Sequence, residues 1–184
     1  VEQLAAKAQS LQVADPWQHP EAMIGPLINA RQRDGCHQVV QAAVAAGARL
    51  LTGGDYEGLF YRPTVLADVA ADNPAFREEI FGPVAVVTPF DTVEEGIALA
   101  NDSLYGLSMG VITGNVGRVM AFADRLRSGL LHINDQTVAD DVIEPFGGVG
   151  ASGNGTSVGG LANPEEFTQW QWLTIKPQPT AYPI

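Results

Sequence analysis

Cysteine, basic residues and long hydrophobic runs are all scarce in this sequence. Cys36 is the only cysteine among 184 residues, so the chain can form no internal disulfide and cannot supply the cysteines of a structural zinc site. Lys and Arg number 10 against 21 Asp and Glu, and the net charge of -11 repels nucleic acid. We therefore expect a cytoplasmic protein that binds neither nucleic acid nor a metal ion.

The hydrophobic runs are also too short for a membrane protein. The richest run, residues 39–51, is interrupted by Gln41 and Arg49, whereas a membrane-spanning helix needs about 20 apolar residues. Apolar positions recur at helical spacing from Val1 onward, with no capping residue before them and no export signal. We expect a soluble chain, without a membrane partner, that begins inside a helix of a longer polypeptide.

Helix and strand patterns alternate along most of the chain. Apolar spacing and capping residues, such as the capping box of Thr92 and Glu95, predict helices over residues 1–11, 29–46, 74–79, 92–100 and 115–128. Short apolar runs predict strands over residues 48–52, 59–69, 84–88, 108–113 and 130–134. Such alternation favours right-handed crossovers between parallel strands. We predict an α/β fold over residues 1–166, with a mostly parallel open sheet and covering helices.

The α/β pattern ends after Asn134. Glycine fills seven of the fourteen positions from Gly147 to Gly160, which excludes a helix or strand interior and predicts a loop. From Phe167 to Lys176, apolar residues alternate onto both faces of an extended chain, which predicts a terminal strand. An unpaired strand with two tryptophans would be an exposed edge. We therefore expect residues 167–176 to form a homo-oligomer by pairing with another copy, within an arm and tail of residues 167–184; the alternative is a return to the chain's own sheet.

Two short motifs in the glycine-rich loop match enzyme signatures without their structural context. Gly148–Gly153 satisfies G-x-G-x-x-G, but no buried strand precedes it and more glycines follow, so a turn loop is the better interpretation. Gly155–Gly159 satisfies G-x-S-x-G around Ser157, but all three histidines precede this serine, against the Ser, acid, His order of α/β-hydrolases. A serine hydrolase is therefore the minor alternative.

Two isolated residues have a structural interpretation. Cys36 and His37 are neighbours on a predicted helix and point about 100° apart, so we expect a partly buried structural cysteine in place of a thiolate–imidazolium pair. His132 lies within a predicted strand, where we expect it to satisfy a local hydrogen bond.

The segment from Glu78 to Pro83 has a pattern with chemical meaning. Glu78 and Glu79 end a helical turn, where the helix dipole disfavours negative charge, and Phe81 follows. A carboxylate can accept hydrogen bonds from both hydroxyls of a ribose, while a neighbouring aromatic ring bounds a planar heterocycle. The pattern indicates contact with a sugar nucleotide. The alternative is a solvated acidic pair beside a core phenylalanine.

Four motifs stand in a specific order and spacing: FYRPTVL (60–66), EEIFGP (78–83), ANDSLYGL (100–107) and PFGG (145–148). In this respect the chain resembles the aldehyde dehydrogenase superfamily over about residues 1–176. The resemblance implies that Glu79 binds the nicotinamide ribose of NAD, with NADP as the alternative cofactor, and that Phe81 lies beside the nicotinamide. It also implies that Phe146 contacts the aldehyde substrate and that the last strand is an oligomerisation arm.

The resemblance covers only the C-terminal part of the family's length. Family members oxidise an aldehyde to the carboxylic acid through a cysteine thiohemiacetal and a thioester, with hydride passing to NAD(P). The nucleophile, the base and the dinucleotide-binding domain would lie upstream of Val1, so the resemblance assigns no catalytic residue to this chain and implies that it is inactive alone. Residues 131–138 and 166–172 look closest to enzymes acting on aromatic aldehydes such as benzaldehyde, salicylaldehyde or vanillin. The alternative is a catalytically silent binding or assembly module of the same fold.

Overall fold

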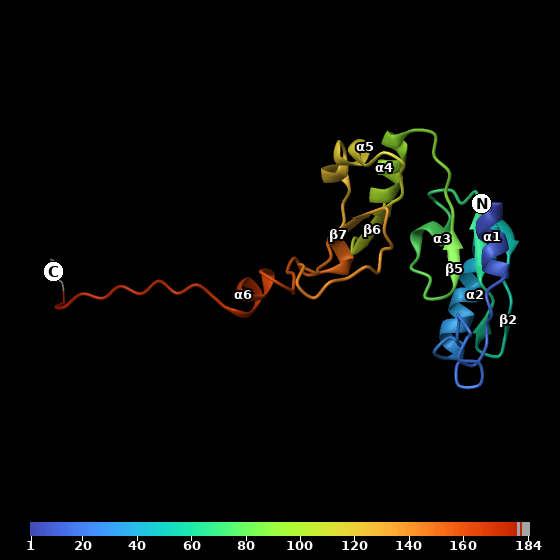
Figure 1. Ribbon diagram of the computed structural model, residues 1–184, viewed down its shortest axis with the longest axis horizontal. Coiled ribbons are helices and arrows are strands. Elements are labelled where there is room, and N and C mark those ends of the chain that lie inside the picture. The colour runs from blue at the N-terminus through green and yellow to red at the C-terminus, as the bar shows by residue number, and fades with distance from the viewer. Residues whose placement is uncertain (180, 182–184) are drawn as a thin grey trace. The chain divides into compact units, whose positions relative to one another are not determined.

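The chain forms two compact units, residues 1–99 and 100–184, in the computed structural model shown in Figure 1. The structure describes residues 1–179 and 181. Both units combine helices with open sheets, which confirms the predicted α/β class. Among the described residues, no helix is both long and apolar enough to cross a bilayer.

Unit 1 contains most of the regular structure. Its helices are α1 (Glu2–Gln9), α2 (Ala30–Ala45) and α3 (Pro74–Arg77), and α4 (Val93–Asn101) continues into unit 2. Its strands are β1 (Arg49–Thr52), β2 (Tyr56–Glu57), β3 (Phe60–Tyr61), β4 (Thr64–Ala67) and β5 (Val84–Val86). The helices fall within or close to the ranges that the sequence predicts, and α1, with Val1 as its N-cap residue, has no side-chain cap, as expected. The single strand predicted over residues 59–69 is instead two strands, β3 and β4, and the sequence does not predict β2.

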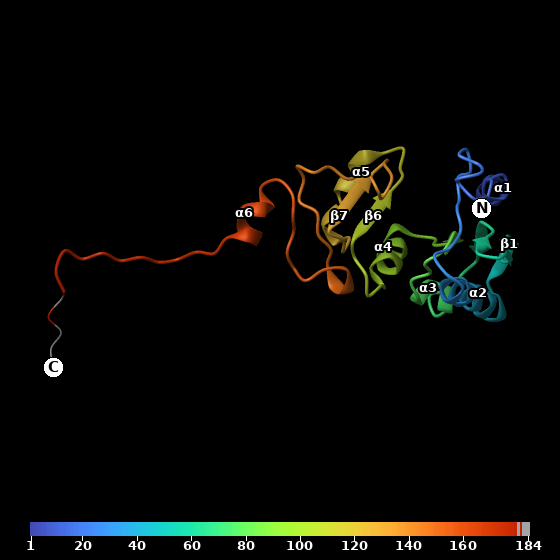
Figure 2. The ribbon, with the colours of Figure 1, turned by 90° about the horizontal axis from the view of Figure 1, so that it is seen from below.

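Strand β4 is the centre of the unit 1 sheet, whose strand order is β1-β4-β5. All four β4 residues are buried, because α1 and α2 both pack on this strand; Figure 2 shows the sheet between the two helices. Strand β5 is parallel to β4, as predicted, whereas β1 is antiparallel to it. The chain returns from β1 to β4 through the short β2–β3 hairpin and makes no helical crossover, and such a return leaves neighbouring strands antiparallel.

The core of unit 1 joins α2 to the sheet and to α3. Cys36, Val40 and Ala43 of α2 pack with Tyr61, Leu66 and other apolar side chains in one buried cluster. Asn73, which is 2% exposed, caps α3 by accepting a hydrogen bond from the Ala75 N–H at 3.0 Å and donates to the Ala43 carbonyl at 3.0 Å. This buried amide therefore fixes α3, and the chain that follows it, against α2.

Unit 2 is built around two parallel strands, β6 (Ser108–Val111) and β7 (Leu130–Ile133), with Gly110 opposite His132. The connection between them contains α5 (Val116–Met120) and a 3₁₀ turn at Ala123–Arg125, where the sequence predicts one continuous helix. A second 3₁₀ turn, Gly150–Ser152, lies in the glycine-rich loop, and α6 (Ala162–Phe167) follows it.

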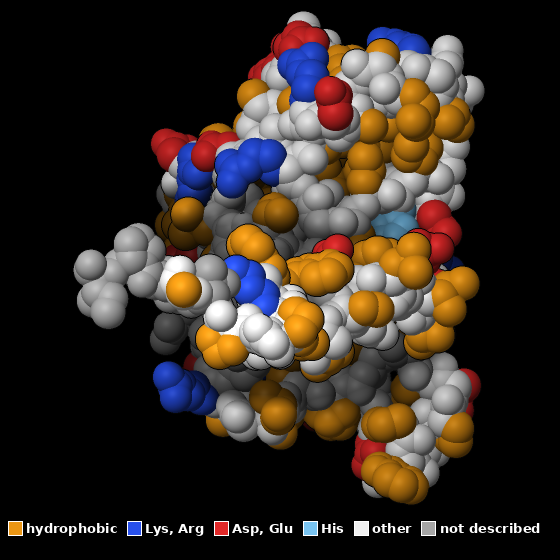
Figure 3. All heavy atoms as spheres, turned by 90° about the vertical axis from the view of Figure 1, so that its left-hand side faces the viewer, with side chains coloured by type: hydrophobic (Ala, Val, Ile, Leu, Met, Phe, Trp, Pro, Cys, Tyr) orange, Lys and Arg blue, Asp and Glu red, His pale blue; other side chains and the backbone are white. Residues whose placement is uncertain are grey.

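Residues 168–176 form no strand within the described single chain, so they do not return to its own sheet, and the expected pairing with another copy stays a prediction. Phe167 ends α6, and residues 168–179 have neither helix nor strand structure (Figure 1). A strand exists only through hydrogen bonds to a neighbouring strand, and the described residues of this chain pair no strand with this segment. Its side chains are fully exposed at Trp170 and 91% exposed at Trp172. Figure 3 presents a face of the molecule on which many hydrophobic side chains are exposed.

Candidate functional site

Glu79 and Phe81 lie in a short connection between α3 and β5. The chain turns sharply here because the Gly82 N–H donates to the Ile80 carbonyl and the Val84 N–H donates to the Gly82 carbonyl, both at 2.8 Å. Ile80 packs against the core cluster, whereas Glu79 is exposed and the Phe81 side chain is 63% exposed. The connection therefore buries its isoleucine and presents the carboxylate and the ring to the outside.

The two residues share one groove on unit 1, of about 370 Å³. One face of α2 forms its other wall, so that the lining residues are Gln32, Gly35, Gln38, Val39, Ala42, Glu78, Glu79 and Phe81. A carboxylate acceptor and an exposed ring beside one groove fit a ribose carrying a planar base. The sequence did not indicate the α2 wall, although positions 32, 35, 39 and 42 have the spacing of one helical face.

Cys36 is a buried structural thiol, as predicted. Its side chain is 2% exposed, and burial raises the pKa of the thiol, an effect that a hydrogen bond with Tyr61 partly offsets. The Tyr61 hydroxyl lies 3.3 Å from His37 Nδ1, and burial raises the pKa of Tyr61. A neutral, buried thiol cannot serve as the nucleophile of an aldehyde oxidation.

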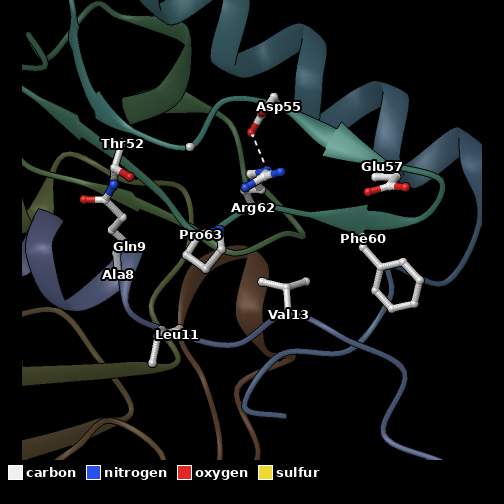
Figure 4. Close-up of a pocket in the computed structure, with 11 residues that line it drawn as sticks. Ala8, Gln9, Leu11, Val13, Thr52, Asp55, Glu57, Phe60, Arg62 and Pro63 are labelled. Atoms are coloured by element: carbon white, nitrogen blue, oxygen red, sulfur yellow. Dashed lines mark ion pairs between the residues drawn. The ribbon is translucent and has the colours of Figure 1, made fainter. Parts of the chain in front are cut away.

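A second cavity in unit 1 contains none of the predicted site residues. It has a volume of about 410 Å³ and lies between the end of α1, the end of β1 and the β2–β3 hairpin. Figure 4 shows Asp55 facing Arg62 across an ion pair of 3.2 Å, with Leu11 and Val13 on the opposite side. Its lining contains no histidine, lysine or cysteine, and its Asp55 carboxylate is already paired with Arg62, so we assign it no chemistry.

Phe146 belongs to unit 2 and is 38% exposed. Its backbone forms an antiparallel bridge with Val158, through hydrogen bonds of 2.7 and 2.9 Å. The loop before it is also anchored, because Ser108 Oγ donates to the Thr137 carbonyl at 2.7 Å and Asn134 Oδ1 accepts from the Thr113 N–H at 2.7 Å. Phe146 therefore extends from a fixed backbone.

The glycine-rich loop folds as a structured turn loop. Gly150 has a φ of 60°, and a Cβ atom at Gly147 would overlap the Thr156 carbonyl oxygen and lie 3.1 Å from Ser157 Cα, so the chain packs backbone against backbone. Among the described residues, no hydrogen bond joins Ser157 to a histidine, which leaves the hydrolase alternative without support.

His132 is expected to satisfy a local hydrogen bond. For its Nε2 atom this prediction is wrong, because Nε2 is buried and has no hydrogen-bond partner in the described part of the chain.

Comparison with known proteins identifies the family. The aldehyde dehydrogenase family matches residues 1–173, so the chain belongs to the aldehyde dehydrogenase family. The resemblance carried by the EEIFGP and PFGG motifs is thereby confirmed.

Relatives with aromatic substrates in their names are among the matches. The whole chain is 48% identical to vanillin dehydrogenase of an Amycolatopsis species, of which it covers 38%. The whole chain is also 45% identical to benzaldehyde dehydrogenase (NAD(+)) of Pseudomonas putida, of which it covers 37%. A solved structure, salicylaldehyde dehydrogenase from Pseudomonas putida G7 complexed with salicylaldehyde, is 33% identical with a TM-score of 0.90, over 98% of this chain and 37% of that one. The chain thus spans less than two fifths of the length of these relatives.

Proposed function

We propose that this chain is the C-terminal portion of an NAD(P)-dependent aldehyde dehydrogenase that oxidises an aromatic aldehyde to the carboxylic acid. The observation that carries the proposal is the groove shared by Glu79 and Phe81 in a member of this family. The names of the relatives, vanillin dehydrogenase and benzaldehyde dehydrogenase (NAD(+)), support the substrate class and the cofactor.

Each residue has one task in this proposal. The carboxylate of Glu79 accepts hydrogen bonds from the hydroxyls of the nicotinamide ribose, and the ring of Phe81 bounds the nicotinamide. When bound, NAD(P) supplies the acceptor for the hydride that leaves the aldehyde carbon. Phe146 contacts the aldehyde, and the backbone bridge to Val158 holds Phe146 in place.

The reacting sulfur belongs to another part of the enzyme in this proposal. Cys36 is buried and its pKa is raised, so it stays protonated and out of reach of a substrate. The cysteine that forms the thiohemiacetal and the thioester, together with the cofactor domain, then lies upstream of Val1. We accordingly propose that the 184 residues alone do not turn over substrate. A reducing cytoplasm suits an enzyme of this kind, which depends on a free thiolate.

The Glu79→Gln variant tests the cofactor site. In the complete gene product, we expect NAD-dependent oxidation of benzaldehyde, and we expect Glu79→Gln to raise the KM for NAD and slow single-turnover NADH formation by about tenfold, because an amide accepts more weakly than a carboxylate. Asp72→Asn removes an exposed acid of the same unit outside the groove and should leave both values unchanged. An unaltered single-turnover rate in Glu79→Gln would contradict the assignment.

We also propose that residues 167–176 act as an oligomerisation arm. Their exposed apolar side chains, with Trp170, Trp172 and Ile175 all more than four fifths exposed, support a strand that forms on pairing with a second copy. Deleting residues 167–184 from the complete gene product should lower the mass measured by light scattering to that of a smaller assembly. If the deleted protein remains folded and its mass per particle falls only by the removed residues, the arm does not hold the assembly together.

The second candidate is a catalytically silent binding or assembly module of the same fold. The absence of a reactive thiol among the described residues favours it if no nucleophile is encoded upstream. A complete gene product that binds partners through its arm but forms no NADH from any aromatic aldehyde would establish this alternative.

A further inference from the structure

The connection that carries Glu79 and Phe81 needs an external support. Its own backbone provides only two tight turns, which place Phe81 and Pro83 at their centres. The Pro83 carbonyl accepts from the Thr64 N–H at 2.8 Å, which ties the far end to the sheet. The stretch from Phe81 to Gly82 contacts α2 instead.

Gly82 packs directly against Cys36 of α2. A Cβ atom at position 82 would lie 2.6 Å from Cys36 Sγ and 3.4 Å from Cys36 Cβ. Such a contact is too short for two side chains, so the thiol occupies the space that glycine leaves free. Because Cys36 is part of the buried core cluster, this contact fixes the position of the turn relative to the core.

Gln32 makes the second contact, one helical turn before Cys36. Its Nε2 donates to the Phe81 carbonyl at 3.0 Å. Residues four apart lie on the same helical face, so Gln32 and Cys36 hold adjacent residues of the turn from one side. The Gln32 N–H in turn donates to the Asn29 side chain at 2.9 Å, which caps α2 and fixes the first turn of the helix.

We propose that Gln32 and Cys36 are positioning residues for cofactor binding. By fixing the Phe81 carbonyl and the Gly82 backbone, they set where the Phe81 ring and the Glu79 carboxylate stand over the groove. Neither residue takes part in bond making in this role. The inference rests on the proposed function of Glu79 and Phe81, and it adds the part of α2 that holds them in place.

The first test is a pair of compensating substitutions in the complete gene product. Gly82→Ala places a methyl group against Cys36 Sγ, and we expect it to weaken NAD binding, measured as a dissociation constant by calorimetry, by about tenfold, because small displacements of a binding group are costly. Adding Cys36→Ala removes the opposing sulfur and should restore most of the affinity. Gly114→Ala is the matched control, since a Cβ atom there would have no neighbour within 4 Å.

The second test addresses the hydrogen bond. Gln32→Ala should raise the KM for NAD several-fold with little change in the KM for benzaldehyde, a split that a general loss of stability would not produce. Gln41→Ala, at an exposed α2 glutamine that does not line the groove, should change neither. Melting temperatures of the NAD-free proteins should fall for Gly82→Ala and recover in the double variant. If Gly82→Ala does not accumulate as folded protein, Gln32→Ala decides the question alone.

The outcomes separate the two proposals. A folded wild-type gene product that does not bind NAD overturns the proposed function, and the positioning role with it. If the wild type binds NAD, an unchanged affinity in both Gly82→Ala and Gln32→Ala overturns the positioning role alone. A double variant no better than Gly82→Ala also overturns it, because the clash with the thiol would then not be the cause.

Discussion

Replacing Tyr61 with alanine should lower the free energy of unfolding by about 3–5 kcal/mol, the range for deleting a buried aromatic side chain. Tyr61 is completely buried, and its ring stacks on Tyr56 at a centroid distance of 6.0 Å and packs in the cluster that joins α2 to the sheet. The reason for the large effect is the cavity that the missing ring would leave among Cys36, Val40 and Leu66. Urea unfolding of the complete gene product, followed by far-UV circular dichroism, measures it.

Two control variants separate the ring of Tyr61 from its hydroxyl. Tyr61→Phe keeps the ring and loses the hydroxyl, with its 3.3 Å contact to His37 Nδ1 and its hydrogen bond with Cys36, so it should cost about 1 kcal/mol. Tyr56→Ala removes a ring that is 37% exposed and should cost less than Tyr61→Ala. A loss below about 1 kcal/mol for Tyr61→Ala would show that this cluster is not the core of the unit.

Gly129→Ala should destabilise unit 2 by about 3 kcal/mol, the upper end of the range for overpacking. A Cβ atom at this position would overlap the Gly147 carbonyl, and a backbone oxygen cannot rotate away as a flexible side chain can. The Gly129 N–H also donates to the Gly106 carbonyl at 3.0 Å, which prevents the residue itself from moving outward. The melting temperature of the complete gene product measures the loss.

The same substitution should selectively alter the proposed aldehyde contact at Phe146. Gly147 follows Phe146 directly, so displacement of the Gly147 carbonyl displaces the backbone that holds Phe146 against Val158. We expect a higher KM for benzaldehyde and an unchanged KM for NAD in whatever fraction remains folded. Gly114→Ala, in open space, should stay within about 0.5 kcal/mol of the wild type. Equal melting temperatures for the two alanine variants would contradict the predicted overlap.

The sequence predicts elements well where a local signal determines them. Asn73 and Asn115 each cap the helix predicted to follow them, because a cap depends on neighbouring backbone donors alone. At Thr92 the capping box forms on one side, since Thr92 Oγ1 accepts from the Glu95 N–H at 3.2 Å, while the Glu95 carboxylate reaches the Asp91 N–H at 2.9 Å instead. Local chemistry thus predicts the start of these helices to within a residue, but not where they end.

Features that depend on distant partners are not predictable in this way. The alternation from Phe167 to Lys176 fits a strand, but strand formation needs a second strand, which the described residues do not provide. His132 stands in a correctly predicted strand, yet its neighbours across the sheet decide whether Nε2 finds an acceptor or donor.

For the candidate site, the EEIFGP motif indicates the carboxylate and the ring, but not the helix that faces them. Gln32 and Phe81 are 49 residues apart in the chain, so no periodicity joins them. The role of Phe146 in contacting the aldehyde stays a prediction, because tertiary structure, and not the local motif, sets what surrounds its side chain.

The seclusion of Cys36 also makes the complete gene product simpler to study with sulfur-directed reagents. Cys36 is only 2% exposed to solvent, and its raised pKa keeps the thiol protonated. It therefore reacts slowly with maleimides or disulfide probes. Rapid labelling of the complete gene product would therefore report cysteines other than Cys36. The proposed catalytic cysteine could then be titrated without first replacing Cys36.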